Sequence, residues 1–284
     1  MIGPEAVVRF VADAGWGAVS DSQPVSGGCI NDGRRLTTTR GPQLFLKVNR
    51  AAPPDMFERE AEGLRALAVA GAPRVPRPVL VGPDFLLLEY LAPAASAPEV
   101  WERFGHELAR LHSQLNPRFG FAHDNYIGHT PQPNAWLEDG FEFFSVRRLL
   151  FQVRLARDHR RLDDRHVRTV ERLAQRLRDI IPEQPASLLH GDLWSGNIHL
   201  GPAGLACLID PAAYFGWAEA DLAMTTLFGR LPEASFAAYA AERPLLAGWR
   251  ERFPVYNLYH LLNHLNLFGS SYLTSITTVL AQFA

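Results

Sequence analysis

The sequence has few cysteines and no long hydrophobic run, and these absences exclude several classes of protein. Only Cys29 and Cys207 occur among the 284 residues, which excludes a disulfide-stabilised scaffold and fits a reducing compartment. No stretch reaches the ~18 apolar residues of a membrane-spanning helix. The first residues also lack the basic and apolar regions of a signal peptide. We therefore expect a cytoplasmic protein with no membrane partner.

The sequence also lacks an excess of charge of either sign. Its 28 Lys and Arg residues nearly balance 30 Asp and Glu residues, for a net charge of −2. No basic field indicates a nucleic-acid partner. Arginines are concentrated in residues 143–181, where two helices with solvated arginine faces are expected and a basic docking surface is the alternative. With 47% apolar residues, the chain can build the core of one or two domains of roughly 100–200 residues each.

The order of the expected elements indicates an α+β protein with two lobes. Residues 4–14 predict a short helix, and residues 23–48 predict short antiparallel strands separated by glycine turns. A helix over 55–70 and a buried strand in FLLLEYL complete an N-terminal lobe, residues 1–91. The Ala- and Pro-rich LAPAASAPEV then predicts a linker. The lobe at 92–284 is expected to be mainly helical, with helices near 100–115, 143–161, 163–181, 219–228, 233–242 and 254–268.

The stretch LLHGDLWSGNIHL, residues 188–200, gathers polar side chains between apolar flanks. His190, Asp192 and Asn197 have the spacing H-x-D-x-x-x-x-N, and Asp210 ends the apolar strand CLID. Phosphoryl transfer needs a carboxylate that deprotonates a hydroxyl and oxygen ligands for Mg²⁺. Asp192 is the candidate base, Asn197 and Asp210 are the candidate metal ligands, and His190 is expected to support the loop. The alternative is that these side chains only cap helices and turns.

Three upstream features favour the phosphoryl-transfer interpretation. Lys47 ends the strand LFLKV, Glu60 lies on the apolar stripe of the next helix, and Gly27-Gly28 forms a turn before both. A lysine that contacts phosphates, steadied by a helix glutamate under a glycine-rich loop, is the kinase nucleotide site. The GxxxxGK[ST] motif of P-loop proteins is absent, as are the GxGxxG, HRD, DFG and APE motifs of protein kinases.

The chain resembles the fructosamine kinase family, a branch of the aminoglycoside-phosphotransferase-like kinases. The resemblance rests on HGDLWSGN, SGGCINDG, FLKVN and DPAAYFGWAEADLAM, and it extends over residues 20 to 270 or so. Aminoglycoside and choline kinases share only the broader frame of HGD, four residues, Asn and a later Asp. One departure is Asp139-Gly140, where the family pattern would have Asp-Trp, so a substrate-side contact is expected to differ there.

The resemblance implies a bilobal protein-kinase-like fold and an ATP- and Mg²⁺-dependent kinase. Adenine would lie near Glu89 and Leu91, and the phosphates would lie against Lys47 and the turn Gly27, Gly28, Cys29 and Ile30. The implied substrate is a ketoamine, the sugar adduct of a small amine or of a protein lysine. Phosphorylation of its sugar 3-hydroxyl would lead to release of the amine. The family also suggests a redox-linked homodimer through Cys29, against the alternative of a silent thiol beside ATP.

Three further side chains are candidates for substrate binding or support. The aromatic face of Trp194 can stack on a sugar or its amine, with a packed core tryptophan as the alternative. His264 is a candidate contact at the substrate end, although core packing explains it nearly as well. Asp221 is expected to brace the catalytic loop by accepting backbone hydrogen bonds.

Two other functions fit the same motifs less well. A kinase of the same fold could act on an aminoglycoside or a choline-like alcohol, but the triplet Trp194-Ser195-Gly196 disfavours it. A nucleotide-binding pseudokinase is disfavoured because Lys47 and the candidate base and metal ligands are all present.

Overall fold

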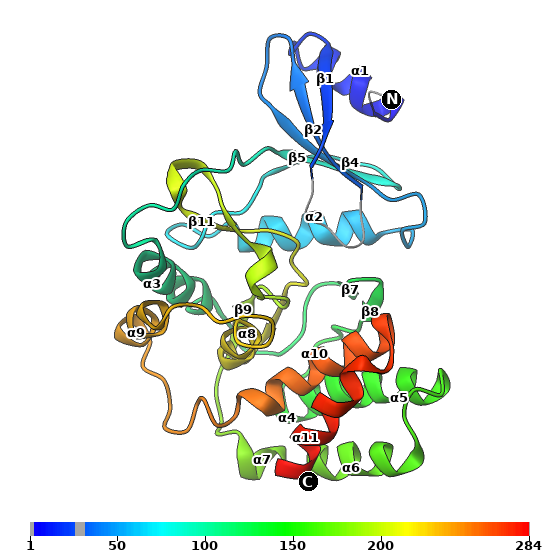
Figure 1. Cartoon of the computed structure of the whole chain (residues 1–284), viewed down its shortest axis with the longest axis vertical. Helices are drawn as coiled ribbons and strands as arrows, with labels where there is room; N and C mark the ends of the chain where they lie inside the picture. The colour runs from blue at the N-terminus through cyan, green and yellow to red at the C-terminus, as the bar shows by residue number, and fades with distance from the viewer. Residues whose placement is uncertain (1–2, 26–31, 284) are drawn as a thin grey trace.

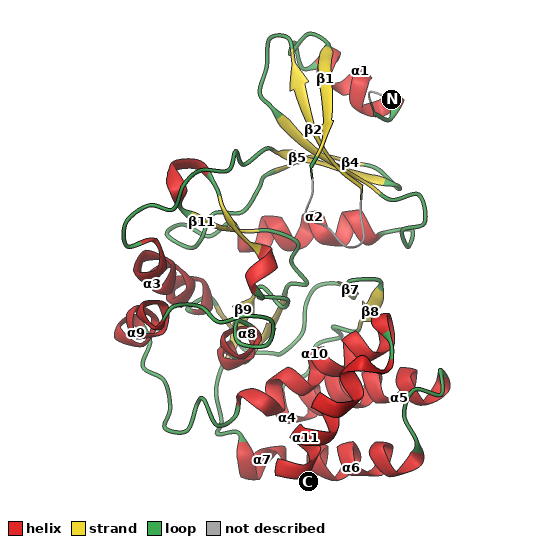
Figure 2. Ribbon diagram, viewed as in Figure 1, coloured by secondary structure: helices red, strands yellow, loops and turns green. Residues whose placement is uncertain are grey.

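The computed structural model describes residues 3–25 and 32–283, and it places a twisted sheet above a larger helical body (Figures 1 and 2). The N-terminal lobe consists of α1 (Glu5–Asp13), β1 (Val19–Pro24), β2 (Asp32–Thr38), β3 (Leu44–Val48), α2 (Met56–Leu67), β4 (Pro78–Val81) and β5 (Phe85–Glu89). The elements after the linker are α3 (Val100–His112), β6 (Leu115–Asn116), β7 (Asn125–Ile127), β8 (Thr130–Gln132), α4 (Gly140–Phe143), η1 (Phe144–Leu149), α5 (Leu150–Asp158), α6 (Asp164–Gln175), α7 (Leu177–Ile180), β9 (Ala186–Leu189), η2 (Ser195–Asn197), β10 (Ile198–Leu200), η3 (Pro202–Gly204), β11 (Ala206–Leu208), β12 (Tyr214–Gly216), α8 (Ala218–Met224), α9 (Glu233–Glu242), α10 (Phe253–Phe268), η4 (Ser270–Tyr272) and α11 (Leu273–Phe283).

The N-terminal sheet is antiparallel, with the strand order β1-β2-β3-β5-β4. Strand β3 lies in the centre of this sheet and pairs with β5. Their apolar sequences, LFLKV in β3 and FLLLE in β5, allow burial on both faces. Successive side chains of a strand alternate between faces. Leu44 and Leu46 therefore pack under α1, whereas Phe45 and Lys47 face a large cavity. This alternation sends the one lysine of β3 toward the cavity.

Helix α2 lies on the cavity side of the sheet, and its apolar face belongs to a large core that extends from β5 through the C-terminal lobe. Phe57, Ala61 and Leu64 repeat at helical spacing and are buried in that larger core. Gly63 lets the helix approach the segment after Asp210, because a Cβ atom there would lie 3.3 Å from Ala213. The small core between the sheet and α1 is a separate cluster.

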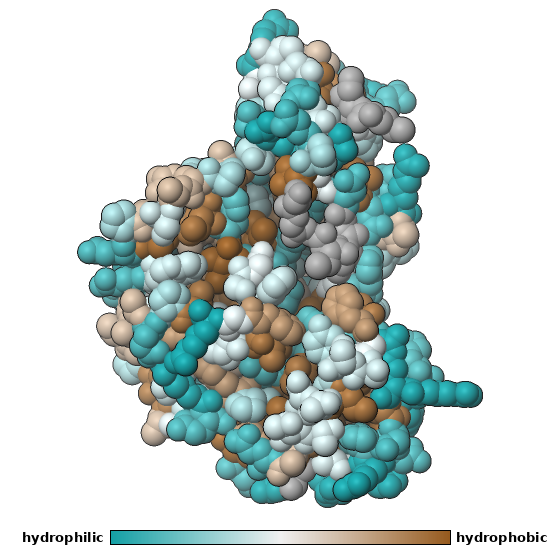
Figure 3. Space-filling model, in the orientation of Figure 1, coloured by the Kyte–Doolittle hydropathy of each residue, from teal (hydrophilic) through white to brown (hydrophobic). Residues whose placement is uncertain are grey.

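The C-terminal lobe is built around β9 and the long helix α10. All four residues of β9 are buried, and β9 pairs with both β12 and β6 in a short antiparallel sheet. Hydrophobic residues gather between the two lobes on the face shown in Figure 3. Among residues 3–25 and 32–283, no helix is long and apolar enough to cross a membrane.

Two features of the C-terminal lobe differ from the sequence predictions. The first Arg-rich segment contains the π-helical η1, and the expectation that its arginines are solvated was wrong for Arg148, which is fully buried. Its guanidinium lies 4.0 Å from the ring centre of Tyr214 and donates to the Pro133 carbonyl and the Asn134 side chain. In addition, α11 follows residue 270, where no helix was predicted, and packs on α10.

Candidate active site

A cavity of about 820 Å³ between the lobes brings together the residues that the sequence singled out. The sheet and α2 form its roof, and the segments after β9 and β11 form its floor. Helix α10 and η4 close one side. The predicted site residues that line it are Lys47, Glu60, Glu89, Leu91, Asp192, Trp194, Asn197, Asp210 and His264. The predicted phosphate-binding turn, Gly27, Gly28, Cys29 and Ile30, lies outside the described residues, as does the predicted thiol link through Cys29.

The loop after β9 is held from below by the buried carboxylate of Asp221, on α8. This carboxylate accepts hydrogen bonds from the backbone N–H of His190 at 2.7 Å and of Gly191 at 2.9 Å. His112 lies 3.3 Å from the same carboxylate. Burial alone would raise the pKa of Asp221, but its hydrogen bonds and the neighbouring histidines lower it overall. Asp221 therefore serves as a charged acceptor under the turn.

Gly191 and His190 shape the turn that presents Asp192. Gly191 has a φ of +82°, and a Cβ atom there would lie 2.0 Å from the Ala212 carbonyl oxygen, so only glycine fits. Burial lowers the pKa of His190, which keeps its ring neutral. The ring Nε2 lies 2.9 Å from the Ile209 carbonyl oxygen and donates to it, while Nδ1 accepts from the Asp192 N–H. His190 thus links the loop to the strand before Asp210.

Asp192 and Asn197 face each other across the loop. The Asn197 side-chain Nδ2 donates to the Asp192 carbonyl oxygen at 2.8 Å and to its Oδ2 at 3.1 Å. Burial raises the pKa of Asp192 to about 7, and the nearby carboxylates of Asp210 and Asp221 add to this. A carboxylate whose pKa lies near neutrality is suited to accept a proton from a hydroxyl.

Lys47 forms the centre of a buried ion-pair cluster at the roof of the cavity. Its Nζ lies 2.6 Å from Glu60 Oε1 on α2 and also contacts Asp210 Oδ1. Burial would lower the pKa of Lys47, but Asp210 and Glu60 outweigh it and raise the pKa. Asp210 itself has a φ of +56°, a left-handed backbone that costs a non-glycine residue about 1–3 kcal/mol. The strained turn directs its carboxylate into the cavity.

Asn197 and Asp210 fit the ligand set of Mg²⁺. Both hydrogen bonds of the Asn197 amide use Nδ2, which leaves its oxygen as the group that can ligate. Mg²⁺ binds one or two protein carboxylates together with phosphate oxygens, not an all-protein cage. Accordingly, residues 3–25 and 32–283 contain no cluster of three or more His, Cys, Asp or Glu side chains suited to a metal.

The linker side of the cavity is apolar and is tied to the C-terminal lobe. Phe45, Leu88 and Ile209 line it near the predicted adenine site. The Leu91 carbonyl lies 2.8 Å from His199 Nε2, so this part of the linker is fixed to β10. The Glu89 carboxylate pairs with Arg74 at the edge of the cavity.

An aromatic wall closes the end of the cavity beyond Asp192. Trp194 meets Phe228 edge-on at 6.1 Å, and Phe228 packs against His264 at 4.6 Å between ring centres. Phe268 and Tyr272 complete the wall. Trp194 is half-buried, in contrast to the alternative of a packed core tryptophan. The sequence analysis missed Phe228, Phe268 and Tyr272, because no motif marks them.

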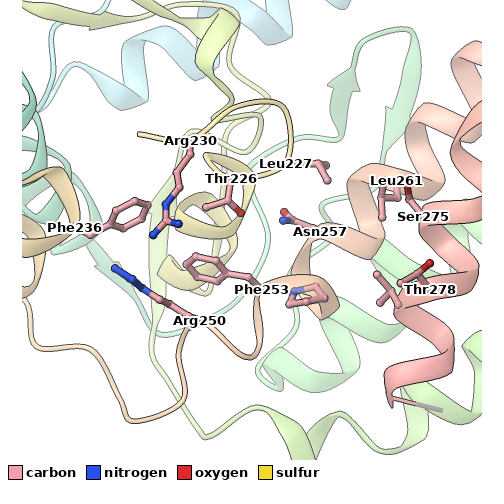
Figure 4. Close-up of a pocket in the computed structure, with 12 residues that line it drawn as sticks. Thr226, Leu227, Arg230, Phe236, Arg250, Phe253, Asn257, Leu261, Ser275 and Thr278 are labelled. Carbon is pink, nitrogen blue, oxygen red and sulfur yellow. The ribbon is translucent and has the colours of Figure 1, made fainter. Parts of the chain in front are cut away.

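A second cavity of about 570 Å³ lies between α10, α11 and the segment 226–230 (Figure 4). Arg230 and Arg250 stand at one end of it, and both pair with Glu233. The segment 226–230 separates the two cavities, because Phe228 lines the first and its neighbours line the second. Among the candidate site residues that the structure describes, none lines this second cavity.

The unusual Asp139-Gly140 pair has a structural role. Asp139 is the N-cap of α4, where its Oδ1 accepts from the Phe141 N–H at 2.8 Å, and it pairs with Arg178. Neither Asp139 nor Gly140 lines the cavity between the lobes.

Known proteins are similar to the chain over nearly its whole length. The fructosamine kinase family matches residues 8–284. A protein of Synechocystis named "Probable ketoamine kinase" is 41% identical over 269 residues, which cover 93% of this chain and 90% of that protein. The chloroplastic "Protein-ribulosamine 3-kinase" of Arabidopsis thaliana is 37% identical, with 91% and 81% covered.

Solved structures agree with this assignment. A fructosamine-3-kinase-type protein from Thermobifida fusca superposes with a TM-score of 0.89 at 34% identity, covering 98% of both chains. An ADP-bound aminoglycoside phosphotransferase superposes with a TM-score of 0.64 at 12% identity, covering 98% of this chain and 97% of the other, which shows the shared fold alone. The prediction of an α+β kinase-like fold is confirmed. By its motifs, its fold and these similarities, the chain belongs to the fructosamine kinase family.

Proposed function

We propose that this protein is an ATP-dependent kinase that phosphorylates the sugar 3-hydroxyl of a ketoamine. The observation that carries the proposal is the convergence of Asp192, Asn197, Asp210 and the Lys47–Glu60 pair on one cavity that ends in an aromatic wall. The first group suits phosphoryl transfer. The wall suits a sugar attached to a cationic amine, because aromatic faces attract both apolar surface and positive charge.

Each residue has a role in this reaction. Lys47, steadied by Glu60, holds the phosphates of ATP, and the linker around Glu89 and Leu91 holds adenine. Asp192 orients the sugar hydroxyl and takes its proton. As that oxygen bonds to the γ-phosphorus, the bond between this phosphorus and the β–γ bridging oxygen breaks, and ADP leaves. Mg²⁺, held by Asn197 and Asp210, would supply positive charge to the phosphates.

Product identification tests the proposal directly. The protein would be incubated with ATP, Mg²⁺ and either ribuloselysine, fructoselysine or an aminoglycoside, and the products followed by phosphorus NMR. Phosphate on the third sugar carbon of a ketoamine supports the proposal. Turnover of the aminoglycoside alone would show that the substrate is an aminoglycoside and not a ketoamine. ATP binding without any turnover would favour the pseudokinase.

Removal of divalent cations is expected to abolish turnover. Asn197 and Asp210 are the two residues assigned as protein ligands, so the metal is expected to be weakly held in the absence of nucleotide. Excess chelator should stop phosphate transfer, and added Mg²⁺ should restore it. Full activity in the chelator would contradict the assignment of these two residues.

Replacement of Trp194 by alanine is expected to weaken ketoamine binding selectively. The ring forms one face of the aromatic wall, and loss of a stacking partner costs about 0.5–1.5 kcal/mol. The KM for the ketoamine should rise up to about tenfold, while the KM for ATP stays constant. Trp101→Ala is the matched control, because Trp101 on α3 is also half-buried but does not line the cavity. Equal changes in both KM values would contradict a role specific to the acceptor.

A further inference from the structure

A second connection joins the lobes at the end of the cavity opposite the linker. The β7–β8 hairpin of the C-terminal lobe lies directly below the N-terminal end of α2 (Figure 1). The Tyr126 hydroxyl donates to Asp55 Oδ1 at 2.7 Å. About two turns further along the same helix edge, His123 Nδ1 lies 2.8 Å from Glu62 Oε1. Arg59 lies between the two carboxylates and pairs with both.

The Asp55 side chain contacts Tyr126 and does not cap α2, although Asp55 stands at the N-cap position. It is the N-cap of α2, where an aspartate ordinarily accepts a hydrogen bond from the N–H two or three residues later. Its side chain makes no such cap. The carboxylate instead meets Tyr126, and it lies 3.4 Å from Arg59 Nε. Burial and Asp55 raise the pKa of Tyr126 to about 12, so the phenol stays a hydrogen-bond donor.

The hairpin is firmly attached to the catalytic floor on its other side. Asn125 donates to the Ala213 carbonyl at 2.8 Å, and Gln132 donates to the Ala212 carbonyl at 3.0 Å. Asn134 donates to Asn125, and the buried Arg148 donates to Asn134. The segment that follows Asp210 therefore carries the hairpin, and the hairpin reaches α2.

We propose that the β7–β8 hairpin holds α2, and with it Glu60, in the position that Lys47 requires. Tyr126 and Asp55 form the central contact, and Arg59, Glu62 and His123 support it; these five residues are the latch. They act as positioning residues in this proposal: Arg59 and Tyr126 also line the cavity, but the proposed effect on ATP passes through Glu60 and Lys47. The inference rests on the proposed kinase function. It agrees with the pairing of Lys47 with Glu60 and with the burial of α2 in the larger core.

A double-mutant cycle at the central contact tests this proposal. Tyr126→Phe and Asp55→Ala should each raise both the KM for ATP and the dissociation constant of ATP about threefold to tenfold, the effect of losing one hydrogen bond. The double variant should be no worse than the stronger single variant, because both remove the same contact. The KM for the ketoamine should stay within twofold. His123→Ala should act in the same direction more weakly.

The control is His166→Ala. His166 also pairs with an aspartate, Asp163, at 2.6 Å, but on α6 and remote from α2, so the affinity for ATP should not change. Three results would overturn the latch: unchanged ATP affinity in Tyr126→Phe, additive effects in the double variant, or a rise only in the ketoamine KM. The last would mean that Tyr126 touches the acceptor. ATP titration needs no acceptor, so it tests the latch even if no ketoamine is phosphorylated.

Discussion

Replacement of Asp192 by asparagine should lower turnover by about 10²–10⁴-fold, the contribution expected of a general base. The amide keeps the size of the side chain but cannot take the hydroxyl proton. Binding of ATP should persist, since the proposed phosphate contact, Lys47, lies on the roof of the cavity and pairs with Glu60 and Asp210, not with Asp192. The measurement is single-turnover transfer to the ketoamine at saturating ATP, with the dissociation constant of ATP measured in parallel.

The parallel affinity measurement separates the base from a structural residue. Asp192 also accepts from Asn197, so a misfolded loop would weaken metal and nucleotide binding together with turnover. Retained affinity with lost turnover identifies Asp192 as the base. Turnover close to that of the wild type would show that another group takes the proton.

Replacement of Asp221 by alanine is expected to be the most destabilising of the substitutions considered. It would leave the buried N–H groups of His190 and Gly191 without their acceptor and would remove the partner of His112. Loss of one member of a buried charged network costs about 3–5 kcal/mol, a large part of the roughly 5–15 kcal/mol that keeps a protein folded. The urea midpoint should fall accordingly, and activity should be lost because the turn that presents Asp192 is released.

Two comparisons complete this experiment. Asp221→Asn retains one acceptor oxygen and should be intermediate in stability. Asp158→Ala removes an exposed carboxylate at the end of α5, and its unfolding free energy should stay within about 0.5 kcal/mol of the wild type. If Asp221→Ala were as stable as that control, Asp221 would not brace the loop.

The sequence predicted the site residues that lie close together in one loop, and those whose direction follows from the pattern of a single strand or helix. Asp192 and Asn197 lie five residues apart in one loop, and Lys47 ends a strand whose alternation alone decides which face it occupies. Glu60 was predictable because a carboxylate on an apolar helix stripe needs a cationic partner. Their catalytic roles remain predictions, which the substitutions above address.

Contacts between segments that are far apart in the sequence could not be predicted, because no local sequence pattern marks them. Phe228 faces Trp194 and His264 only because α8 and α10 pack together, and Tyr126 meets Asp55 across 71 residues of sequence. Arg148 is buried in an Arg-rich segment whose Arg154, Arg157 and Arg160 are exposed, and the rings that surround it in the folded chain distinguish it. Helix α11 begins LTSITT, which is rich in β-branched residues with weak helix propensity. Its packing on α10 stabilises it instead.

The division of the hydrophobic core has a consequence for how the chain unfolds. The cluster between the sheet and α1 contains only eight buried apolar residues, whereas α2 belongs to a much larger cluster that includes Leu86 and Leu88 of β5 and extends through the C-terminal lobe. Cooperative units of a protein follow shared buried contacts and not the order of the chain. The buried apolar residues of α1, β1 and β2 belong to the small cluster alone, so these elements form the weakest unit and can open while β5 and α2 stay folded with the C-terminal lobe. Such an opening removes β2, the strand that pairs with β3 beside Lys47, so partial unfolding begins next to the proposed nucleotide site and leaves the Asp192 loop intact.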